Sequence, residues 1–290
     1  MADGRGFDPA PGAGGVTPAY SCQRNDQTTK QRFRQQANVR RGYEKLLVLP
    51  GVDVTDDLDR ELPLNVIYRD QWLCAVDKPC EMMVHFSRLG TDRQFVVQML
   101  RDQIGQKVWP VHRLDRATSG VLLFALDRDT ASAVGKQFMA QTVAKRYLAV
   151  ARGWVDEEGE IDHPLKKHKS DEEGQPSVTR YRRLATAELP IAMGEHGTVR
   201  YSLVEVFPKT GRRHQIRRHF KHISHHLIGD TTYGDGRHNR VFRQHLGCHR
   251  LLLHSSRLEL THPQDGHRLG VEASPSGDLA RVVGEVFCGD

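Results

Sequence analysis

The sequence has no long hydrophobic run and only a few scattered cysteines. No stretch of its 290 residues approaches the roughly 18 uncharged apolar residues that a membrane-spanning helix needs. The first residues, MADGRGFDPAPGAGG, contain no apolar segment of the kind that marks a secretory signal. The 5 cysteines form no CxxC pair, so a disulfide framework is not expected. We therefore expect a cytoplasmic protein with reduced thiols and no membrane partner.

Acidic residues are scarce in two segments of an otherwise mildly basic chain. Lysine and arginine together number 42, against 36 aspartates and glutamates, which gives a formal net charge of +6. The basic side chains crowd into residues 30–45 and 200–222. Such clusters indicate a polyanionic partner, most simply nucleic acid. A solvated charged face without a partner is the alternative, and charge alone does not separate the two.

The composition divides the chain into three parts. Residues 1–60 begin rich in Gly, Pro and Ala and continue through a basic and then an acidic stretch, so they are predicted to be a flexible basic N-terminal extension and linker. Residues 61–275 carry the hydrophobic patterns of a folded domain, and residues 276–290 are expected to be a C-terminal tail. Many short strands with few helices between them predict an α+β fold, with a mixed, mostly antiparallel central sheet and flanking helices.

Hydrophobic spacing predicts where the helices and strands lie. Helices are expected over residues 93–105, closed by Gly105, over 128–143, and over 210–224 with Thr210 as the N-cap. Residues 177–189 and 199–208 are expected to pair as antiparallel strands. The other expected strands are 64–70, 72–79, 108–114, 120–127, 144–155, 250–263 and 267–273.

A single carboxylate stands out in the segment VHRLDRATSGVLLFAL. Asp115 follows a predicted strand that ends at His112 and Arg113, and a buried strand begins shortly after it. Arg113 and Arg116 would keep this side chain ionised, and an ionised carboxylate on a loop between rigid strands is a candidate nucleophile or base. Alternatively, Asp115 is a structural turn residue that accepts hydrogen bonds from its own backbone.

The segment PKTGRRHQIRRHF is the second candidate site. Ile216, Phe220 and Ile223 recur at helical spacing and predict a buried stripe. Arg213 and Arg217 would flank this stripe one turn apart, where a guanidinium can pair with a carboxylate. The side chains expected to face solvent are His214, Arg218 and Lys221. An ordinary basic surface helix is the alternative interpretation.

Five motifs occur in the order HRLDRATSGVLL, KRYLAVARGWV, KTGRRHQIRRH, LIGDTTYGD and LLLHSSRLELTHP. Together they resemble the RluA family of RNA pseudouridine synthases, over about residues 62–273. The segments VHFSRLGTDRQFVVQMLRDQIGQ, RRHFKHISHHLIGD and GDGRHNR are most similar to the TruC branch, whose members act at tRNA position 65. The resemblance implies the pseudouridine synthase catalytic fold for residues 61–275 and isomerisation of a uridine in structured RNA.

The resemblance assigns the catalytic roles residue by residue. Asp115 corresponds to the catalytic nucleophile or base. Tyr147 is expected to stack on the target uracil and is a candidate acceptor of the C5 proton, although an alternating strand also fits a core tyrosine. Arg217 is expected to pair with the Asp115 carboxylate. Ala117 departs from the proline of some relatives, which affects loop stiffness rather than chemistry.

The resemblance and the basic clusters together assign the RNA-binding residues. Arg113 is expected to fill the gap left by the flipped base. The other predicted RNA-binding residues are His112, Arg116, Arg213, Arg218 and Lys221. The motif containing Gly229, Asp230 and Tyr233 is expected to build the site wall. The isomerisation requires no cofactor and no metal, and we expect a monomer without an obligate protein partner.

Four alternatives remain open at this stage. A ribosomal RNA substrate would need the same catalytic residues as tRNA. A non-catalytic RNA-binding module would bind RNA without forming product. A glycoside hydrolase would need a second carboxylate, and none stands out in a comparable motif. A zinc site is the fourth, because histidines crowd together although no standard ligand spacing is present. These residues are His219, His222, His225, His226, His245, Cys248, His249 and His254.

Overall fold

The structure is a computed structural model that describes residues 63–85, 94–167 and 170–288. The predicted N-terminal extension, residues 1–60, lies outside these ranges. In the described part of the chain, no helix is long and apolar enough to cross a membrane.

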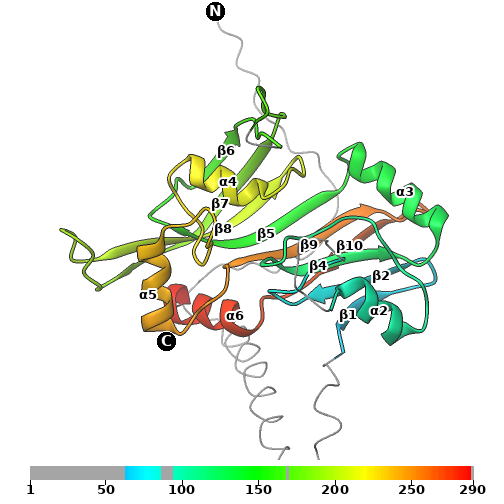
Figure 1. The fold of residues 1–290 in the computed structure, drawn as a ribbon, viewed down its shortest axis with the longest axis horizontal. Coiled ribbons are helices and arrows are strands. Elements are labelled where there is room, and N and C mark those ends of the chain that lie inside the picture. The colour runs from blue at the N-terminus through cyan, green and yellow to red at the C-terminus, as the bar shows by residue number, and fades with distance from the viewer. Residues whose placement is uncertain (1–62, 86–93, 168–169, 289–290) are drawn as a thin grey trace, which may run out of the picture.

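A sheet of ten strands runs through the described chain (Figure 1). The strands are β1 (Asn65–Arg69), β2 (Leu73–Lys78), β3 (Trp109–Pro110), β4 (Ser119–Ala125), β5 (Ala144–Arg152), β6 (Glu158–Asp162), β7 (Val178–Leu189), β8 (Val199–Pro208), β9 (Leu253–Thr261) and β10 (Arg268–Glu272). Their order is β1-β2-β4-β9-β5-β8-β7-β6, with β10 beside β9 and β3 beside β4. Among the strand pairs of the described residues, β4 and β9 alone run parallel. The predicted mixed, mostly antiparallel sheet is confirmed.

Helices cover both faces of this sheet. They are α2 (Val96–Ile104), α3 (Arg128–Met139), α4 (Gln215–His222), α5 (Gly236–Leu246) and α6 (Gly277–Val283), which continues into a π-helical turn, η1 (Gly284–Cys288). Successive side chains of a strand point to opposite faces. In β5, Leu148 and Val150 pack with α5 and α6, whereas Ala149 and Ala151 pack with α4. Strand β4 is buried throughout, because α3 covers one face and α2 the other.

The predicted C-terminal end of α2 is correct, although the helix begins at Val96 rather than at residue 93, and the predicted start of α4 is wrong. Gly105 closes α2 in the left-handed conformation, with φ 66°, as the sequence predicts. Helix α4 begins only at Gln215, because His214 before it has φ 55° and interrupts the helix. Thr210 is therefore not an N-cap. Its hydroxyl donates to the Gln215 side-chain oxygen at 2.7 Å, so residues 210–214 form a loop fastened to the start of α4.

The C-terminal residues expected to be a tail belong to the folded domain. Leu279, Val282 and Val283 of α6 are buried in a cluster with side chains of β5, β8 and α5. Phe287 of η1 is buried in the same cluster. The boundary expected at residue 275 therefore moves to the end of the described chain. Leu279, Val282, Val283 and Val286 recur at helical spacing in this segment, which places them on one helical face.

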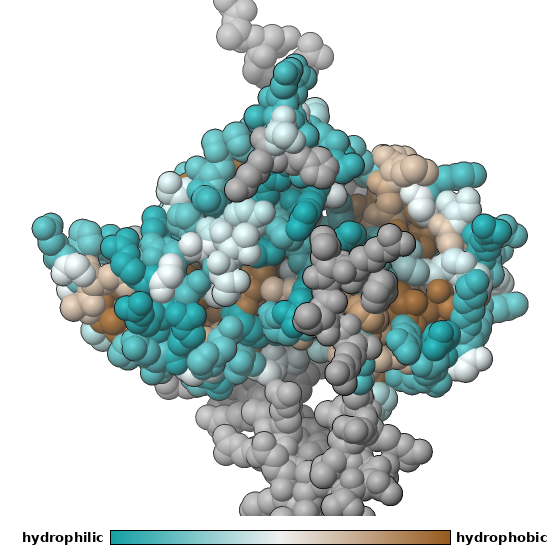
Figure 2. Space-filling view, viewed as in Figure 1, coloured by the Kyte–Doolittle hydropathy of each residue, from teal (hydrophilic) through white to brown (hydrophobic). Residues whose placement is uncertain are grey.

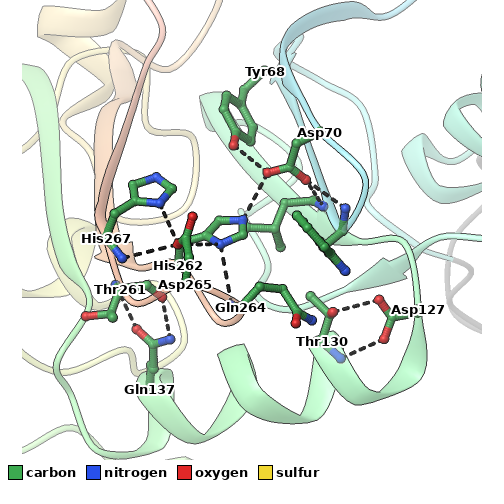
Figure 3. A network of polar contacts seen from close by, with 12 residues as sticks. Tyr68, Asp70, Asp127, Thr130, Gln137, Thr261, His262, Gln264, Asp265 and His267 are labelled. Atoms are coloured by element: carbon green, nitrogen blue, oxygen red, sulfur yellow. Dashed lines mark hydrogen bonds and ion pairs between the residues drawn. The ribbon is translucent and has the colours of Figure 1, made fainter.

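A polar network fastens the β9–β10 turn to the β1–β2 turn (Figure 3). The buried His262 lies with Nε2 3.0 Å from Asp70 Oδ2. Tyr68 donates its hydroxyl to the same oxygen at 2.5 Å, and the Trp72 and Leu73 amides donate to Oδ1. Burial opposes ionisation of Asp70, but these hydrogen bonds hold its pKa below the usual range. The network joins two turns that are far apart in the sequence.

Asp70→Ala should destabilise the protein by about 1–3 kcal/mol at pH 7, because it leaves His262 and two amides without their acceptor. Since the folded-state pKa of Asp70 is lowered, its stabilisation is present above the unfolded-state value and is lost as pH falls through the folded value. Urea unfolding at pH 7 and pH 3 measures both effects. Asp156→Ala is the control, because Asp156 is exposed and lies outside this network. Equal unfolding midpoints for wild type and Asp70→Ala at pH 7 would contradict this role.

Candidate active site

A cavity of about 790 Å³ is lined by residues from the C-terminal end of α3, from β5 and from the start of α4. Its walls come from residues 111–115 with Thr118, the C-terminal end of α3, the first half of β5 and residues 208–217. Figure 2 shows hydrophilic side chains over α4 and a gathering of apolar side chains at α3. Six residues predicted from the sequence line the cavity: His112, Arg113, Asp115, Tyr147, Arg213 and Arg217.

The charge of the cavity is strongly one-sided. Asp115 is the one acidic residue among the described residues that line it. The lining cations are Arg113, Lys145, Lys167, Lys209, Arg212, Arg213 and Arg217. A polyanion would be attracted to a cavity lined by so many positive charges. The glycoside hydrolase alternative is disfavoured here, because the cavity offers no second carboxylate.

The loop that carries Asp115 is held by the last side chain of β2 and by one that follows the strand. The buried Lys78 ammonium donates to the Arg116 carbonyl at 3.1 Å, and the Cys80 thiol donates to the Ala117 carbonyl at 3.0 Å. Burial lowers the pKa of Lys78 to about 8. Sequence reasoning missed both residues, since nothing in their local pattern shows which loop they reach. The fixed backbone leaves the Asp115 side chain 21% exposed.

Arg217 lies near the Asp115 carboxylate but is bound more closely by the carboxylate of Asp230. Its Nη1 lies 3.6 Å from Asp115 Oδ2, as the predicted pairing requires. Its Nε and Nη2 donate to the two Asp230 oxygens at 2.7 and 2.8 Å. Burial opposes ionisation of Asp230, yet Arg217 and two backbone amides hold the pKa of this carboxyl below its usual range. Asp230 therefore fixes the guanidinium, which reaches Asp115 with its remaining nitrogen.

The Asp230 turn is built so that it can hold Arg217. The amides of Thr232 and Tyr233 donate to Asp230 Oδ1 at 2.8 and 2.9 Å. Gly229 has φ 79°, and a Cβ at this position would lie 1.9 Å from the Arg250 carbonyl oxygen. Gly229, Asp230 and Tyr233 were expected to be a site wall. The structure instead places them outside the cavity lining, with Asp230 supporting Arg217.

Tyr147 lines the cavity from β5 and remains protonated at neutral pH. It packs against the hydrophobic side chains beneath α4 and α2. Burial raises its pKa to about 12, and the negative charge of Asp115 adds to this effect. A hydrogen bond with Ser255 opposes the shift. The predicted stacking on uracil suits a neutral phenol, whereas taking the C5 proton would require a phenolate that this environment disfavours.

His214, which was expected to face solvent, lines the cavity instead. Its Nε2 lies 3.8 Å from Asp115 Oδ1, and its Nδ1 lies 3.1 Å from the Tyr233 hydroxyl. The expectation was wrong because a continuous helix was assumed through residue 214. The left-handed backbone of His214 turns this residue out of the helical pattern. No periodicity in the sequence signals such a residue.

Comparison with known proteins identifies the family. Residues 73–222 match the family model described as RNA pseudouridylate synthase. The chain belongs to this family. The mixed sheet and the helices that flank it are thus the pseudouridylate synthase fold.

Two curated members of the family are similar in sequence to most of this chain. The tRNA pseudouridine synthase C of Vibrio cholerae is 50% identical over 220 residues, which cover 72% of this chain and 90% of that protein. The protein of the same name from Salmonella typhi is 47% identical over 220 residues, covering 72% and 85%.

Two solved human structures share the fold. RNA Pseudouridylate Synthase Domain Containing 1 has a TM-score of 0.59 and 24% identity, over 73% of this chain and 83% of that one. RNA Pseudouridylate Synthase Domain Containing 4 has a TM-score of 0.60 and 22% identity, over 76% and 91%.

The predicted RNA-binding arginines divide into two groups in this pseudouridylate synthase. Arg113 and Arg213 are exposed and line the cavity. Arg116 forms an ion pair with Glu81 at 2.8 Å. Three predicted residues lie outside the cavity lining: Arg116, Arg218 and Lys221. Their contact with RNA stays a prediction.

His112 lines the pseudouridylate synthase cavity as an uncharged residue. Its Nε2 accepts a hydrogen bond from the Leu123 amide at 3.0 Å, and its ring stacks on Phe138 with centroids 5.1 Å apart. Burial lowers its pKa to about 3. A cationic contact with phosphate is therefore disfavoured at this position, and the predicted RNA binding by His112 stays a prediction.

The histidines of the candidate zinc cluster do not converge on one point. Within the described residues, the ligand atoms that lie close enough to hold a metal belong to His262, Asp265 and His267, all within 4.8 Å of one another. These residues form the β9–β10 turn of Figure 3, not the cavity of the pseudouridylate synthase. Of the original cluster, His254 is buried between Ser119 and the Ala273 carbonyl.

Proposed function

We propose that this chain converts one uridine of a tRNA, at position 65, to pseudouridine, with Asp115 as nucleophile or base. The observation that carries the proposal is the single carboxylate of Asp115 in a cavity whose other charged lining residues are lysines and arginines, beside Tyr147 and Arg217. A tRNA substrate is supported by relatives named tRNA pseudouridine synthase C, one of them 50% identical over 220 residues. We further propose that the chain acts as a cytoplasmic monomer.

The proposed reaction needs few protein groups besides these residues. The N1–C1′ bond of uridine breaks, the base turns, and a C5–C1′ bond forms while C5 loses its hydrogen as a proton. Product and substrate have the same composition, so the net reaction is an isomerisation. Asp115 acts on the base or the sugar, and the neutral Tyr147 stacks on the uracil. Taking the nucleotide out of its stack costs roughly a few kcal/mol, which the cations of the cavity offset through phosphate contacts.

Arg213→Ala should weaken tRNA binding and reduce the slope of log affinity against log salt by about 1, because one phosphate contact is lost. The rate at saturating tRNA should stay near that of wild type. Filter binding at several salt concentrations measures the slope. Arg240→Ala is the matched control, because this exposed arginine lies on α5, which packs on the opposite face from α4. An unchanged slope for Arg213→Ala would remove this residue from the RNA interface.

The experiment that tests the proposed function maps pseudouridine in defined RNAs. Unmodified tRNA and ribosomal RNA transcripts are incubated with the purified protein, and carbodiimide labelling with primer extension locates the product. A stop at position 65 of tRNA supports the proposal. A stop in ribosomal RNA alone would contradict the substrate and retain the reaction. RNA binding with no stop in either transcript would favour the non-catalytic module.

A further inference from the structure

We propose that His214 is a positioning residue for the Asp115 carboxylate, and that Tyr233 holds His214 in place. This inference rests on the proposed function, in which Asp115 is the reacting group. It identifies a second support for Asp115 besides Arg217. We call the pair of supports, His214 and Arg217, the Asp115 clamp.

Each residue of the clamp lies near a different oxygen of the Asp115 carboxylate. Oδ1 lies 3.8 Å from His214 Nε2, and Oδ2 lies 3.6 Å from Arg217 Nη1. Both distances exceed a hydrogen bond, so the two donors flank the carboxylate without occupying its lone pairs. Contacts of this kind are often long in an empty site and shorten when substrate binds. The clamp thus orients Asp115 and leaves it available to react.

The backbone of His214 indicates that this placement is maintained against a local cost. Its φ of 55° lies in the left-handed region, which non-glycine residues adopt rarely. Such conformations persist where the surroundings determine them, and they gather at functional sites. Here the conformation ends the loop before α4, and the Arg218 amide still donates to the His214 carbonyl at 2.9 Å. The imidazole therefore stands at the start of α4, beside Asp115.

Both residues of the clamp are held by the turn that contains Asp230 and Tyr233. Asp230 binds Arg217 through two hydrogen bonds and also accepts the Tyr233 amide at 2.9 Å. The Tyr233 hydroxyl lies 3.1 Å from His214 Nδ1, and the two rings meet edge to face with centroids 5.5 Å apart. The turn thereby supports Oδ1 of Asp115 through His214 and Oδ2 through Arg217. This explains why residues of the turn matter to the cavity without lining it.

A neutral His214 can act as a hydrogen-bond donor to Asp115 rather than as a positive counter-ion. Burial lowers its pKa, and the groups that face it divide into carboxylates, which raise it, and cations, which lower it. They are Asp115, Arg217, Arg213 and Asp230, with the Tyr233 hydroxyl at Nδ1. When Tyr233 donates to Nδ1, the single N–H of the neutral ring is on Nε2 and faces Asp115. A second proton would place a full positive charge beside the carboxylate and reduce its reactivity.

Three substitutions at one position separate side-chain and backbone roles. His214→Gln keeps an N–H donor at a similar reach, His214→Asn keeps the tolerance for a left-handed backbone, and His214→Ala keeps neither. We expect His214→Ala and His214→Asn to lower kcat about 10- to 100-fold with little change in KM for tRNA. His214→Gln should retain kcat within about fivefold of wild type. Full activity of His214→Ala, or of His214→Asn, would overturn the proposal.

Two further readouts distinguish positioning from folding. The kcat of wild type should fall on the acid side as His214 protonates, and His214→Gln should move this limb to lower pH. Tyr233→Phe should lower kcat in the same direction, and its effect should largely disappear in the His214→Ala background. An unmoved acid limb, or fully additive effects, would contradict the clamp. If Asp115→Asn stays active, the proposed function fails; if it is inactive while His214→Ala is unimpaired, only this inference fails.

Discussion

Asp115→Asn is expected to lower the rate of pseudouridine formation by roughly 10³-fold or more, while the fold and the affinity for tRNA stay close to wild type. The amide has nearly the shape of the carboxylate but lacks its negative charge and its basicity. The cations proposed to bind phosphate are separate side chains around the cavity and remain in place. Single-turnover assays with excess enzyme measure the chemical step, and filter binding measures the affinity.

The matched control for Asp115→Asn is Asp102→Asn. Asp102 is exposed on α2 and pairs with the neighbouring Arg101 at 2.8 Å. This variant should keep wild-type activity, which shows that loss of one negative charge is not the cause. A rate for Asp115→Asn within tenfold of wild type would contradict the role assigned to Asp115.

Arg217→Ala is expected to lose both stability and activity. The Arg217 and Asp230 side chains are only 7% and 1% exposed, so removing the guanidinium leaves a buried carboxylate without its partner. Breaking a buried pair in this way costs about 3–5 kcal/mol of unfolding free energy. The same change also removes the group that faces Asp115 Oδ2. Urea unfolding measures the first effect, and single-turnover rates measure the second.

Two companion variants separate these effects. Asp230→Asn with Arg217→Ala completes a double-mutant cycle, and the double variant should be more stable than the two separate losses predict when they are added. Arg217→Lys keeps the charge but loses the bidentate geometry, so it should recover little activity. Arg240→Ala is the control, since this exposed arginine lies on α5 and outside the cavity lining. Wild-type activity of Arg217→Ala in a folded state would remove Arg217 from the catalytic machinery.

Most strands were predictable because alternation and apolar runs are local features of the sequence, whereas β6 was not expected and β3 is shorter than expected. The β7–β8 pair and the buried β4 lie close to where alternation and apolar runs predict them. The end of α2 was predictable because Gly105 adopts a left-handed conformation at low cost. Helix α6 was missed because its seven residues are too few to show a helical period clearly.

The sequence predicted which residues belong to the site better than it predicted how they contact one another. Motifs placed Asp115, Tyr147 and Arg217 together, and the structure brings all three to one cavity. The main partner of Arg217 was missed, because Asp230 approaches it through a turn whose geometry no spacing reveals. His214 was placed on the wrong side, because a single positive φ interrupts an otherwise helical pattern. Such contacts depend on tertiary structure rather than on local propensity.

The most direct test of the account is release of the C5 hydrogen from RNA that carries tritium at C5 of its uridines. Conversion to pseudouridine joins C5 to C1′, so each turnover transfers one tritium from that position to water. The account predicts that wild-type protein releases tritium from a tRNA transcript, up to about one equivalent per modified uridine, and that Asp115→Asn releases none above background. Release by Asp115→Asn at the wild-type rate, or no release by a wild-type protein that binds the transcript, would contradict it.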